Sequence, residues 1–386
     1  MVARYLNPTS AMTITKQAVL DRLSRIVGPD GAPLSVSGVL SEIVAGEGKV
    51  FFSISVDEAS LSAWQAVRKQ AEDAVRAMPG VTTAMVALTA ERRPGAPARP
   101  PAAAPAASGR APAGHAPKGT AVPGIAAIIA VASGKGGVGK STTAVNLALA
   151  LRELGLKVGL LDADIYGPSL PKLLAIDEKP ETAGGTRLKP IVRFGLPAMS
   201  IGFLIGAETA MVWRGPMVVS ALTQMLREVE WGELDVLLVD MPPGTGDAQI
   251  TMAQQVPLRG AVIVSTPQDL ALADARRGIA MFQKVSVPIL GIVENMSYFH
   301  CPACGERADI FGHGGARAEA RRLGVPFLGE VPLHMAIRET SDSGTPVVAS
   351  DPQGPHAAAY REIAARLRDE LAGAPQRAAP RIVIEP

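Results

Sequence analysis

Apolar positions in the first 90 residues follow two different spacings. Two segments have the helical period of 3.6 and predict amphipathic helices, and three segments have strand-like runs. We therefore expect residues 1–90 to form a small αββαβ domain of the α+β class, and since it has neither cysteine nor histidine it offers no evident chemistry. The predicted helices are 14–27 and 61–78, and the predicted strands are 34–44, 50–56 and 81–88.

The pattern changes beyond this domain. Residues 91–123 contain 8 prolines and 11 alanines and almost no large apolar side chain, which is typical of an extended linker. Continuous apolar runs then alternate with longer helical patterns, as in a parallel sheet covered on both faces. We predict a doubly wound, mostly parallel α/β domain over 124–373 and a tail over 374–386. Its expected strands are 126–132, 157–161, 236–240, 260–265, 289–294 and 326–330, and its last helix is 356–371.

Composition limits the classes of function. The chain has 38 Lys and Arg against 36 Asp and Glu, a formal charge of +2 without a basic block, so nucleic acid is not an expected partner. Apolar runs are shorter than the ~20 residues of a membrane-spanning helix, and residues 1–12 lack the apolar core of a signal peptide, so no membrane partner is expected. Two cysteines, Cys301 and Cys304, are too few for a secreted disulfide scaffold, and a cytoplasmic protein is predicted.

A glycine-rich loop follows the first strand of the second domain. It matches G-x-x-x-x-G-K-[ST] between a strand and a helix, so its backbone N–H groups are expected to surround phosphate oxygens. Lys140 would reach the β- and γ-phosphates and Ser141 would ligate Mg²⁺, whereas the alternative is a glycine turn that binds nothing. The expected nucleotide-binding residues here are Gly134, Lys135, Gly136, Gly137, Val138, Gly139, Lys140, Ser141 and Thr142.

Lys135 is a second lysine, one position after the first glycine of the loop. It is either a solvated surface lysine or a residue that crosses a dimer interface and neutralises charge developing on the partner's nucleotide. Residues 133–142 resemble the deviant Walker A loop of the MinD and ParA group of dimerising ATPases, which includes Mrp-type carriers. This resemblance implies ATP as the nucleotide and a catalytic role for Lys135 together with Lys140.

Asp240 ends the apolar strand 236–240, which is the layout of a Walker B motif, and would hold Mg²⁺ through water. The residues after it, 241–247, are too rich in proline and glycine for a helix. They look like a switch loop in which Gly244 donates its N–H to the γ-phosphate.

Asp162 and Asp164 follow the strand 157–161, where the resembled group has its other switch. The resemblance implies that Asp164 orients the attacking water, as a catalytic residue, and that Asp162 assists near Mg²⁺. The alternative is an acidic pair in a surface loop, although strand ends in α/β folds are where ligands bind.

Asn295 follows the strand 289–294 on the ligand side of the sheet. An asparagine amide can pair with N6 and N7 of adenine, and the resemblance implies that Asn295 reads the base. Without the resemblance, an asparagine at this place is more often an ordinary turn former.

Cys301 and Cys304 have C-x-x-C spacing and allow three interpretations. A thioredoxin-like redox pair would need a helix that begins at the first cysteine, whereas Pro302 and Gly305 favour a knuckle-shaped turn. A zinc knuckle would need two further ligands, and only two histidines lie nearby. A [4Fe-4S] cluster usually takes four thiolates, so one chain supplies two and a symmetric homodimer supplies four.

Four runs together closely resemble the Mrp (ApbC) family of iron-sulfur cluster carrier ATPases. The resemblance implies a homodimer in which Cys301 and Cys304 of both subunits hold one [4Fe-4S] cluster that is passed to apo iron-sulfur proteins, with slow ATP hydrolysis. Residues 1–90 resemble, more weakly, an iron-sulfur assembly domain, but without a cysteine. The runs are DIYGPS (164–169), WRGPM (213–217), DMPPGTGD (240–247) and GIVENMSYFHCPACG (291–305).

A positioning ATPase of the MinD or ParA type is the alternative function. Such proteins reach a membrane through a basic amphipathic C-terminal helix, or DNA through a basic surface. Residues 381–386 offer neither feature, and this alternative leaves the cysteine pair unexplained.

Overall fold

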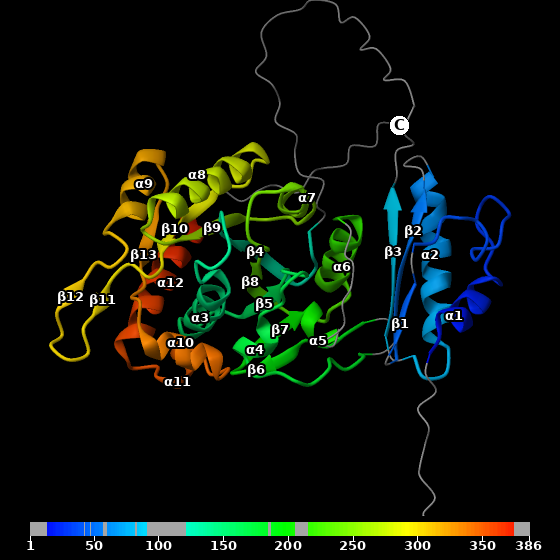
Figure 1. Ribbon diagram of the computed structural model, residues 1–386, viewed down its shortest axis with the longest axis horizontal. Helices are drawn as coiled ribbons and strands as arrows, with labels where there is room; N and C mark the ends of the chain where they lie inside the picture. Colours follow the sequence, from blue (N-terminus) through cyan, green and yellow to red (C-terminus); the bar gives the residue numbers. More distant parts are fainter. Residues whose placement is uncertain are drawn as a thin grey trace, which may run out of the picture. The chain divides into compact units, whose positions relative to one another are not determined.

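The structure is a computed structural model of the chain. It describes residues 14–41, 43–46, 48–56, 60–81, 83–90, 121–183, 187–204 and 215–373. The chain folds into two compact units, an N-terminal one and a larger C-terminal one (Figure 1). Most of the linker predicted over 91–123, and all of the tail predicted over 374–386, lie outside the described residues, so these boundaries stay predictions.

The N-terminal unit has the expected element order αββαβ. Its middle strand, β2, is antiparallel to β1 and parallel to β3. The first helix begins after Thr15, whose hydroxyl accepts a hydrogen bond from the N–H of Ala18 at 3.2 Å, a normal N-cap. The elements are α1 (Lys16–Leu23), β1 (Val44–Gly46), β2 (Lys49–Val56), α2 (Leu61–Arg76) and β3 (Thr83–Ala90).

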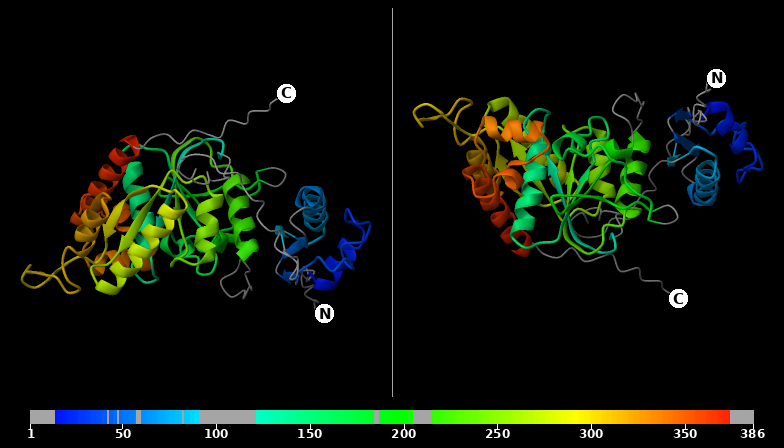
Figure 2. Two further views of the ribbon diagram at one scale, coloured as in Figure 1. Left: turned by 90° about the horizontal axis from the view of Figure 1, so that it is seen from above. Right: turned by 90° about the horizontal axis from the view of Figure 1, so that it is seen from below.

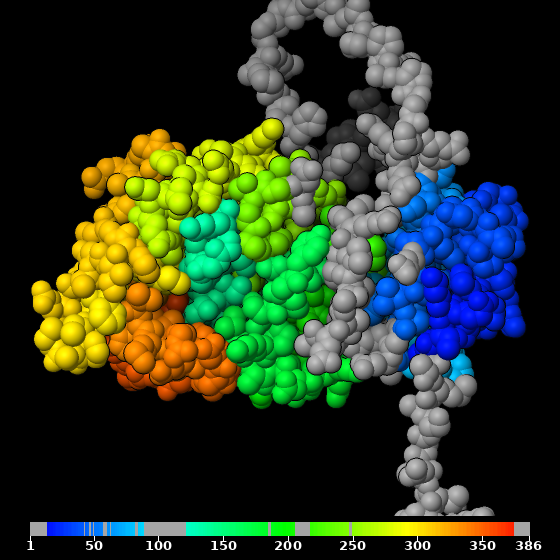
Figure 3. All heavy atoms as spheres, in the orientation of Figure 1, coloured from blue at the N-terminus to red at the C-terminus, as the bar shows by residue number. Residues whose placement is uncertain are grey.

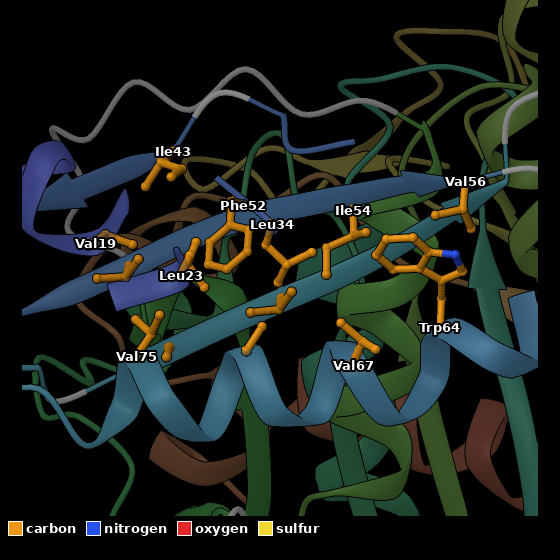
Figure 4. Close-up of a cluster of buried hydrophobic side chains, with 14 of the residues drawn as sticks. Val19, Leu23, Leu34, Ile43, Phe52, Ile54, Val56, Trp64, Val67 and Val75 are labelled. Carbon is orange, nitrogen blue, oxygen red and sulfur yellow. The ribbon is translucent and has the colours of Figure 1, made fainter. Parts of the chain in front are cut away.

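An apolar core lies between this sheet and its helices. Figure 4 shows Trp64, Val67 and Val75 of α2 pointing toward Phe52 and Ile54 of β2, and all five are buried. Burial of a side chain of this size contributes about 1.5–3 kcal/mol. The apolar positions that predicted α2 as an amphipathic helix are therefore those that face the sheet.

The strand predicted over 34–44 is wrong for most of its length. Val36 and Ser37 donate their N–H groups to the carbonyl of Pro33, and Gly38 has a left-handed φ of +71°. Residues 33–38 therefore form a turn, because a residue in this region of φ interrupts an extended strand. Among the described residues of this stretch, the bridge and neighbouring hydrogen bonds of residues 39–41 to β2, and the short strand β1, are what remains of the predicted strand.

The C-terminal unit contains a large sheet with the order β13-β10-β9-β4-β8-β5-β7-β6 among the described residues. Every neighbouring pair is parallel except the edge pair β6–β7. The predicted fold, a doubly wound and mostly parallel sheet, is confirmed. The strands are β4 (Ile125–Ala132), β5 (Val158–Asp162), β6 (Ile191–Arg193), β7 (Leu196–Ser200), β8 (Leu234–Asp240), β9 (Gly260–Ser265), β10 (Ile289–Glu294) and β13 (Phe327–Glu330).

Helices cover both faces of this sheet (Figure 2). The helix after the glycine-rich loop, α3, packs against α12 on one face, and α8 packs against α9 on the other. Every residue of α3 from Thr143 to Leu151 is buried, so the helix that follows the loop is held firmly in place. The helices are α3 (Lys140–Glu153), α4 (Leu170–Leu173), α5 (Ile201–Leu204), α6 (Gly215–Arg227), α7 (Asp247–Gln255), α8 (Asp269–Lys284), α9 (Gly315–Leu323), α10 (Met335–Asp342), α11 (Val347–Ser350) and α12 (Pro355–Gly373).

Two short hairpins were not predicted. One is β6–β7 at the edge of the large sheet, and the other pairs β11 (Phe299–His300) with β12 (Arg307–Ala308). The β11–β12 hairpin projects from the C-terminal unit in Figure 1 and forms the yellow lobe at the left edge of Figure 3. Within the described part of the chain, none of the helices combines the length and apolar character needed to cross a membrane.

Candidate functional site

The glycine-rich loop lies between β4 and α3, at the carboxyl edge of the sheet. Gly137 and Gly139 have φ values of +81° and +80°, a region that favours glycine. A Cβ on Gly134 would lie 2.2 Å from the carbonyl of Asp274 in α8, so this position has no room for a side chain. The loop leads directly into the first turn of α3, where N–H groups have no partner within the helix and favour an anion.

A cavity of about 460 Å³ opens in front of this loop, a normal size for a small-molecule site. Most of the predicted loop residues line it, together with Asp164 from the segment after β5. The other predicted residues, Gly134, Val138, Asp162, Asp240, Gly244 and Asn295, are not part of the lining. The predicted residues that line the cavity are Lys135, Gly136, Gly137, Gly139, Lys140, Ser141, Thr142 and Asp164.

The far wall of the cavity was missed by the sequence analysis. It includes Lys172 of α4, whose Nζ is 3.9 Å from Oδ1 of Asp342 in α10, and Ser341. These residues are far apart in sequence and belong to no motif. The one available signal was general: α10 follows β13, and ligands in such folds bind beyond the carboxyl ends of strands.

Lys140 makes a buried ion pair with Asp240. Their Nζ and Oδ1 atoms are 2.5 Å apart, with 6% and 0% of the two side chains exposed. The same ammonium donates to the hydroxyl of Ser141 at 3.1 Å. Phosphate oxygens that enter the cavity would compete with Asp240 for this ammonium, because both are anions within its reach.

Asp240 and Ser141 are suited to hold Mg²⁺. Among the described residues, Oδ2 of Asp240 is buried without a hydrogen-bond partner. A buried carboxylate oxygen without a donor is costly, and hard cations such as Mg²⁺ prefer oxygen ligands of this kind. Mg²⁺ bound here would neutralise charge on the phosphates.

Asp162 lies beside Asp240, since the two residues are register partners in β5 and β8. Its Oδ2 accepts hydrogen bonds from the N–H groups of Ser169 and Leu170 and from the hydroxyl of Ser200, at 2.9, 3.2 and 3.0 Å. Burial, and then the carboxylate of Asp240, raise the pKa of Asp162 to about 7. Asp162 thus organises the segment after β5, and its assistance to Mg²⁺ stays a prediction.

Asp164 and Gly244 lie in the two segments expected to be switches. The N–H of Gly244 donates to the carbonyl of Ser133 at 3.0 Å, so its predicted bond to a γ-phosphate requires this contact to open. Burial raises the pKa of Asp164, and the nearby Lys140 partly opposes the increase. A raised pKa suits a carboxylate that orients water and accepts a proton.

Asn295 lies against the glycine-rich loop and is almost fully buried. Its Nδ2 donates to the carbonyl of Val138 at 2.8 Å, and a Cβ on Gly139 would lie 2.2 Å from that nitrogen. This amide therefore supports the loop from beneath, a role that the sequence analysis did not foresee. Its predicted role in reading the base remains a prediction.

The two cysteines lie in the turn of the β11–β12 hairpin, Cys301 half-buried and Cys304 exposed. The N–H of Gly305 donates to the carbonyl of Cys301 at 2.8 Å, and Gly305 has a φ of +74°, which gives a tight turn like the expected knuckle. The N–H groups of Cys304 and Ala303, and then the thiol of Cys304, lower the pKa of Cys301. Hydrogen bonds of this kind favour the thiolate, which is the form that binds metal.

Arg307 connects the base of this hairpin to the sheet. Its guanidinium lies 4.2 Å from the ring centre of Tyr298 and bonds through Nε to Asp309 at 3.1 Å. It is also 3.8 Å from the carboxylate of Glu330 at the end of β13. These contacts fix the base of the hairpin, although its turn projects from the unit.

Arg214, which belongs to one of the resembled motifs, lies outside the described residues.

The loop between β4 and α3, its terminal lysine and the aspartate that ends β8 define a P-loop nucleoside triphosphatase. Residues 124–368 match the family described as NUBPL iron-transfer P-loop NTPase (ParA), and residues 16–86 match the family of iron-sulfur cluster assembly proteins. The chain belongs to the NUBPL iron-transfer P-loop NTPase family. The resemblance inferred from the sequence motifs is thereby confirmed.

Individual proteins agree with this assignment. The iron-sulfur cluster transfer protein NUBPL of Dictyostelium discoideum is 55% identical over 64% of this chain and 77% of its own length. The iron-sulfur cluster carrier protein of Escherichia coli (strain K12) is 56% identical over 64% of this chain and 68% of its own length. A solved Archaeoglobus fulgidus structure, titled a nucleotide-binding protein in complex with ADP, is 42% identical with a TM-score of 0.54, over 61% of this chain and 91% of that one.

Proposed function

We propose that this protein is an iron-sulfur cluster carrier. Two chains hold one [4Fe-4S] cluster through Cys301 and Cys304 of each chain and deliver it to apo iron-sulfur proteins. ATP binds at the P-loop and is hydrolysed slowly. Relatives that are named as cluster carrier and cluster transfer proteins support this proposal.

The observation that carries the proposal is the cysteine pair on the projecting hairpin. Backbone N–H groups aimed at the sulfur of Cys301 stabilise the thiolate, and the exposure of Cys304 leaves the pair open to a second protein. The chain has two cysteines, whereas such a cluster usually takes four thiolates, so a second chain completes the ligand set. Neither chain alone then encloses the cluster, which suits a cargo that must leave.

The nucleotide site has the residues for phosphoryl transfer to water. Lys140 binds the phosphates, Ser141 and Asp240 hold Mg²⁺, and Asp164 orients the attacking water. Lys135 lines the same cavity and would reach the nucleotide of the partner chain in a dimer, where it neutralises developing charge.

Anaerobic loading with iron and sulfide tests the proposal. The unsubstituted chain should give a brown dimer with four iron atoms per two chains, and Cys301→Ser should lose both the iron and the cluster-linked dimer. Lys172→Met serves as the matched control, because Lys172 is 70% exposed, both cysteines are retained and the protein should still load. The proposed carrier function is overturned if Cys301→Ser retains iron at the original stoichiometry. It is also overturned if the product is colourless and sediments with liposomes or DNA.

The role of ATP needs a separate measurement. Lys140→Ala protein loaded with cluster should transfer it to an apoprotein more slowly than the unsubstituted protein when ATP is present. Equal transfer by the two proteins would remove ATP from the proposed function and leave the cluster carrier itself intact.

A further inference from the structure

One buried carboxylate joins both ends of the segment that carries the cysteines. This segment, residues 298–314, is called here the cysteine segment. Glu294 ends β10 and is fully buried, and its Oε1 accepts the hydroxyl hydrogen of Ser297 at 2.6 Å. Its Oε2 accepts the N–H of Ala316, also at 2.6 Å. Ser297 directly precedes the cysteine segment and Ala316 lies in the first turn of α9, so a single side chain contacts both ends.

The two ends of the cysteine segment are held differently. At the start, the backbone also bonds to the chain after β13: Ser297 donates to Val331 at 3.0 Å, and Leu333 donates to Tyr298 at 2.7 Å. At the end, α9 begins after Gly314, which has no side chain to cap the helix. The carboxylate of Glu294 takes the place of that cap, because an anion at a helix N-terminus satisfies a free N–H and the helix dipole.

The residue after Glu294 contacts the phosphate-binding loop. Asn295 donates its side-chain N–H to Val138, and its amide leaves no room for a side chain on Gly139. Met296 has a left-handed φ of +55°, which a non-glycine residue adopts only where its surroundings impose it. The chain from Glu294 to Ser297 therefore has a fixed path, with the loop on one side and the cysteine segment on the other.

We propose that Glu294 is a positioning residue through which nucleotide binding changes the orientation of Cys301 and Cys304. A phosphate that binds the loop shifts the backbone at Val138, and Asn295 moves with it. Glu294, the adjacent residue, transmits this displacement to both ends of the cysteine segment. The inference rests on the proposed function only in taking these cysteines as the ligands of the cargo.

The test measures how fast the cysteines are alkylated in the full-length, cluster-free protein, with and without Mg²⁺ and a non-hydrolysable ATP analogue. In the unsubstituted protein the nucleotide should change the rate by about fivefold or more, as for an ordinary allosteric coupling. Glu294→Ala should reduce this change to less than about twofold, because both hydrogen bonds are lost. A titration with a fluorescent ATP analogue should show that Glu294→Ala still binds nucleotide.

Two variants separate positioning from a general structural effect. In Glu294→Gln the side-chain oxygen can accept from Ala316 and the amide can donate to Ser297, so this variant should retain the nucleotide-dependent change. Glu319→Ala removes a carboxylate on α9 that pairs with Arg276 and Arg322. This variant should also retain the nucleotide-dependent change in alkylation rate.

The inference is overturned if nucleotide leaves the alkylation rate of the unsubstituted protein unchanged, or if Glu294→Ala responds as the unsubstituted protein does. Should Glu294→Ala fail to fold, Ser297→Ala removes one of the two contacts and should reduce the response partway, and a full response would be contrary to the inference. Alkylation needs no cluster, so a failure to load iron would contradict the carrier function without touching this result.

Discussion

Replacing Lys140 with methionine is expected to destabilise the C-terminal unit in addition to removing the proposed phosphate ligand. Methionine has a similar length but no charge, so Asp240 keeps its buried position without its partner 2.5 Å away. Asp162, the register partner of Asp240, adds a second buried carboxylate. Breaking a buried ion pair in this way costs about 3–5 kcal/mol, whereas loss of an exposed lysine costs roughly 0–1 kcal/mol.

The destabilisation is expected to depend on pH. The pKa of Asp162 is already raised to about 7 by burial and by Asp240, and Lys140 is one of the groups that hold it down, so the pKa rises further in Lys140→Met. A carboxylate with a higher pKa in the folded than in the unfolded state makes stability fall as pH rises between the two values. Lys140→Met should therefore lose more stability at about pH 8 than at about pH 5. At about pH 5 the carboxyl group of Asp162 is protonated in the folded state of both the variant and the unsubstituted protein.

Hydrogen exchange of peptides from α3 and β8, without nucleotide or Mg²⁺, measures the opening free energy of the C-terminal unit by itself. Lys172→Met is the matched control, because Lys172 is 70% exposed and lies 3.9 Å from its partner Asp342. The double variant Lys140→Met, Asp240→Asn should recover part of the loss, since one of the unpaired charges is gone. If exchange in Lys140→Met is as slow as in Lys172→Met at both pH values, the argument from the buried pair is refuted.

Gly139→Ala should weaken ATP binding, measured by calorimetric titration, by about tenfold or more (~1.4 kcal/mol), because the added Cβ would meet the amide of Asn295. Gly155→Ala is the control and should bind ATP normally, because Gly155 also has a positive φ, of +91°, but no atom of the described residues lies near its Cβ position. Lys135→Ala should bind ATP but hydrolyse it more slowly, and undiminished phosphate release would show that Lys135 is only a surface lysine. The alkylation rate of Cys301 should rise with pH through a midpoint below the ordinary thiol pKa of about 8.5, because backbone N–H groups stabilise its thiolate; a midpoint at or above that value would contradict this.

Most strands that support the site could be predicted because they are continuous apolar runs, whereas the buried strand β7 was missed because Pro197 and Ser200 interrupt its apolar pattern. For β9 and β10 the predicted and observed bounds agree. The edge strand β6 has only three residues, and Val192 in it is 62% exposed, so no apolar pattern marks it. The strands β11 and β12 have two residues each and are held by contacts such as that of Arg307 with Tyr298, which no local pattern encodes.

The motif residues of the site could be located because they belong to elements that are adjacent in sequence or in the sheet. A strand, a loop and a helix that are adjacent in sequence bring Lys140 to the cavity, and the end of the next strand in the sheet brings Asp240 to it. The contact of Asn295 with Val138 joins residues 157 positions apart, and its partner depends on how β10 and the loop are placed in space. Its place after a strand, together with the family resemblance, identified Asn295 as a candidate, but neither could show which group its amide contacts.

The two ends of the cysteine segment meet at the same carboxylate, and this closeness makes the segment a replaceable cassette. An insertion whose ends lie side by side can be exchanged for a short turn without stretching the strand before it or the helix after it. The P-loop body and the cysteine segment can thus vary in sequence independently, while Glu294 keeps its contacts at both ends of the segment. Chains built on the same body could take different cargoes by changing only the loop between β10 and α9.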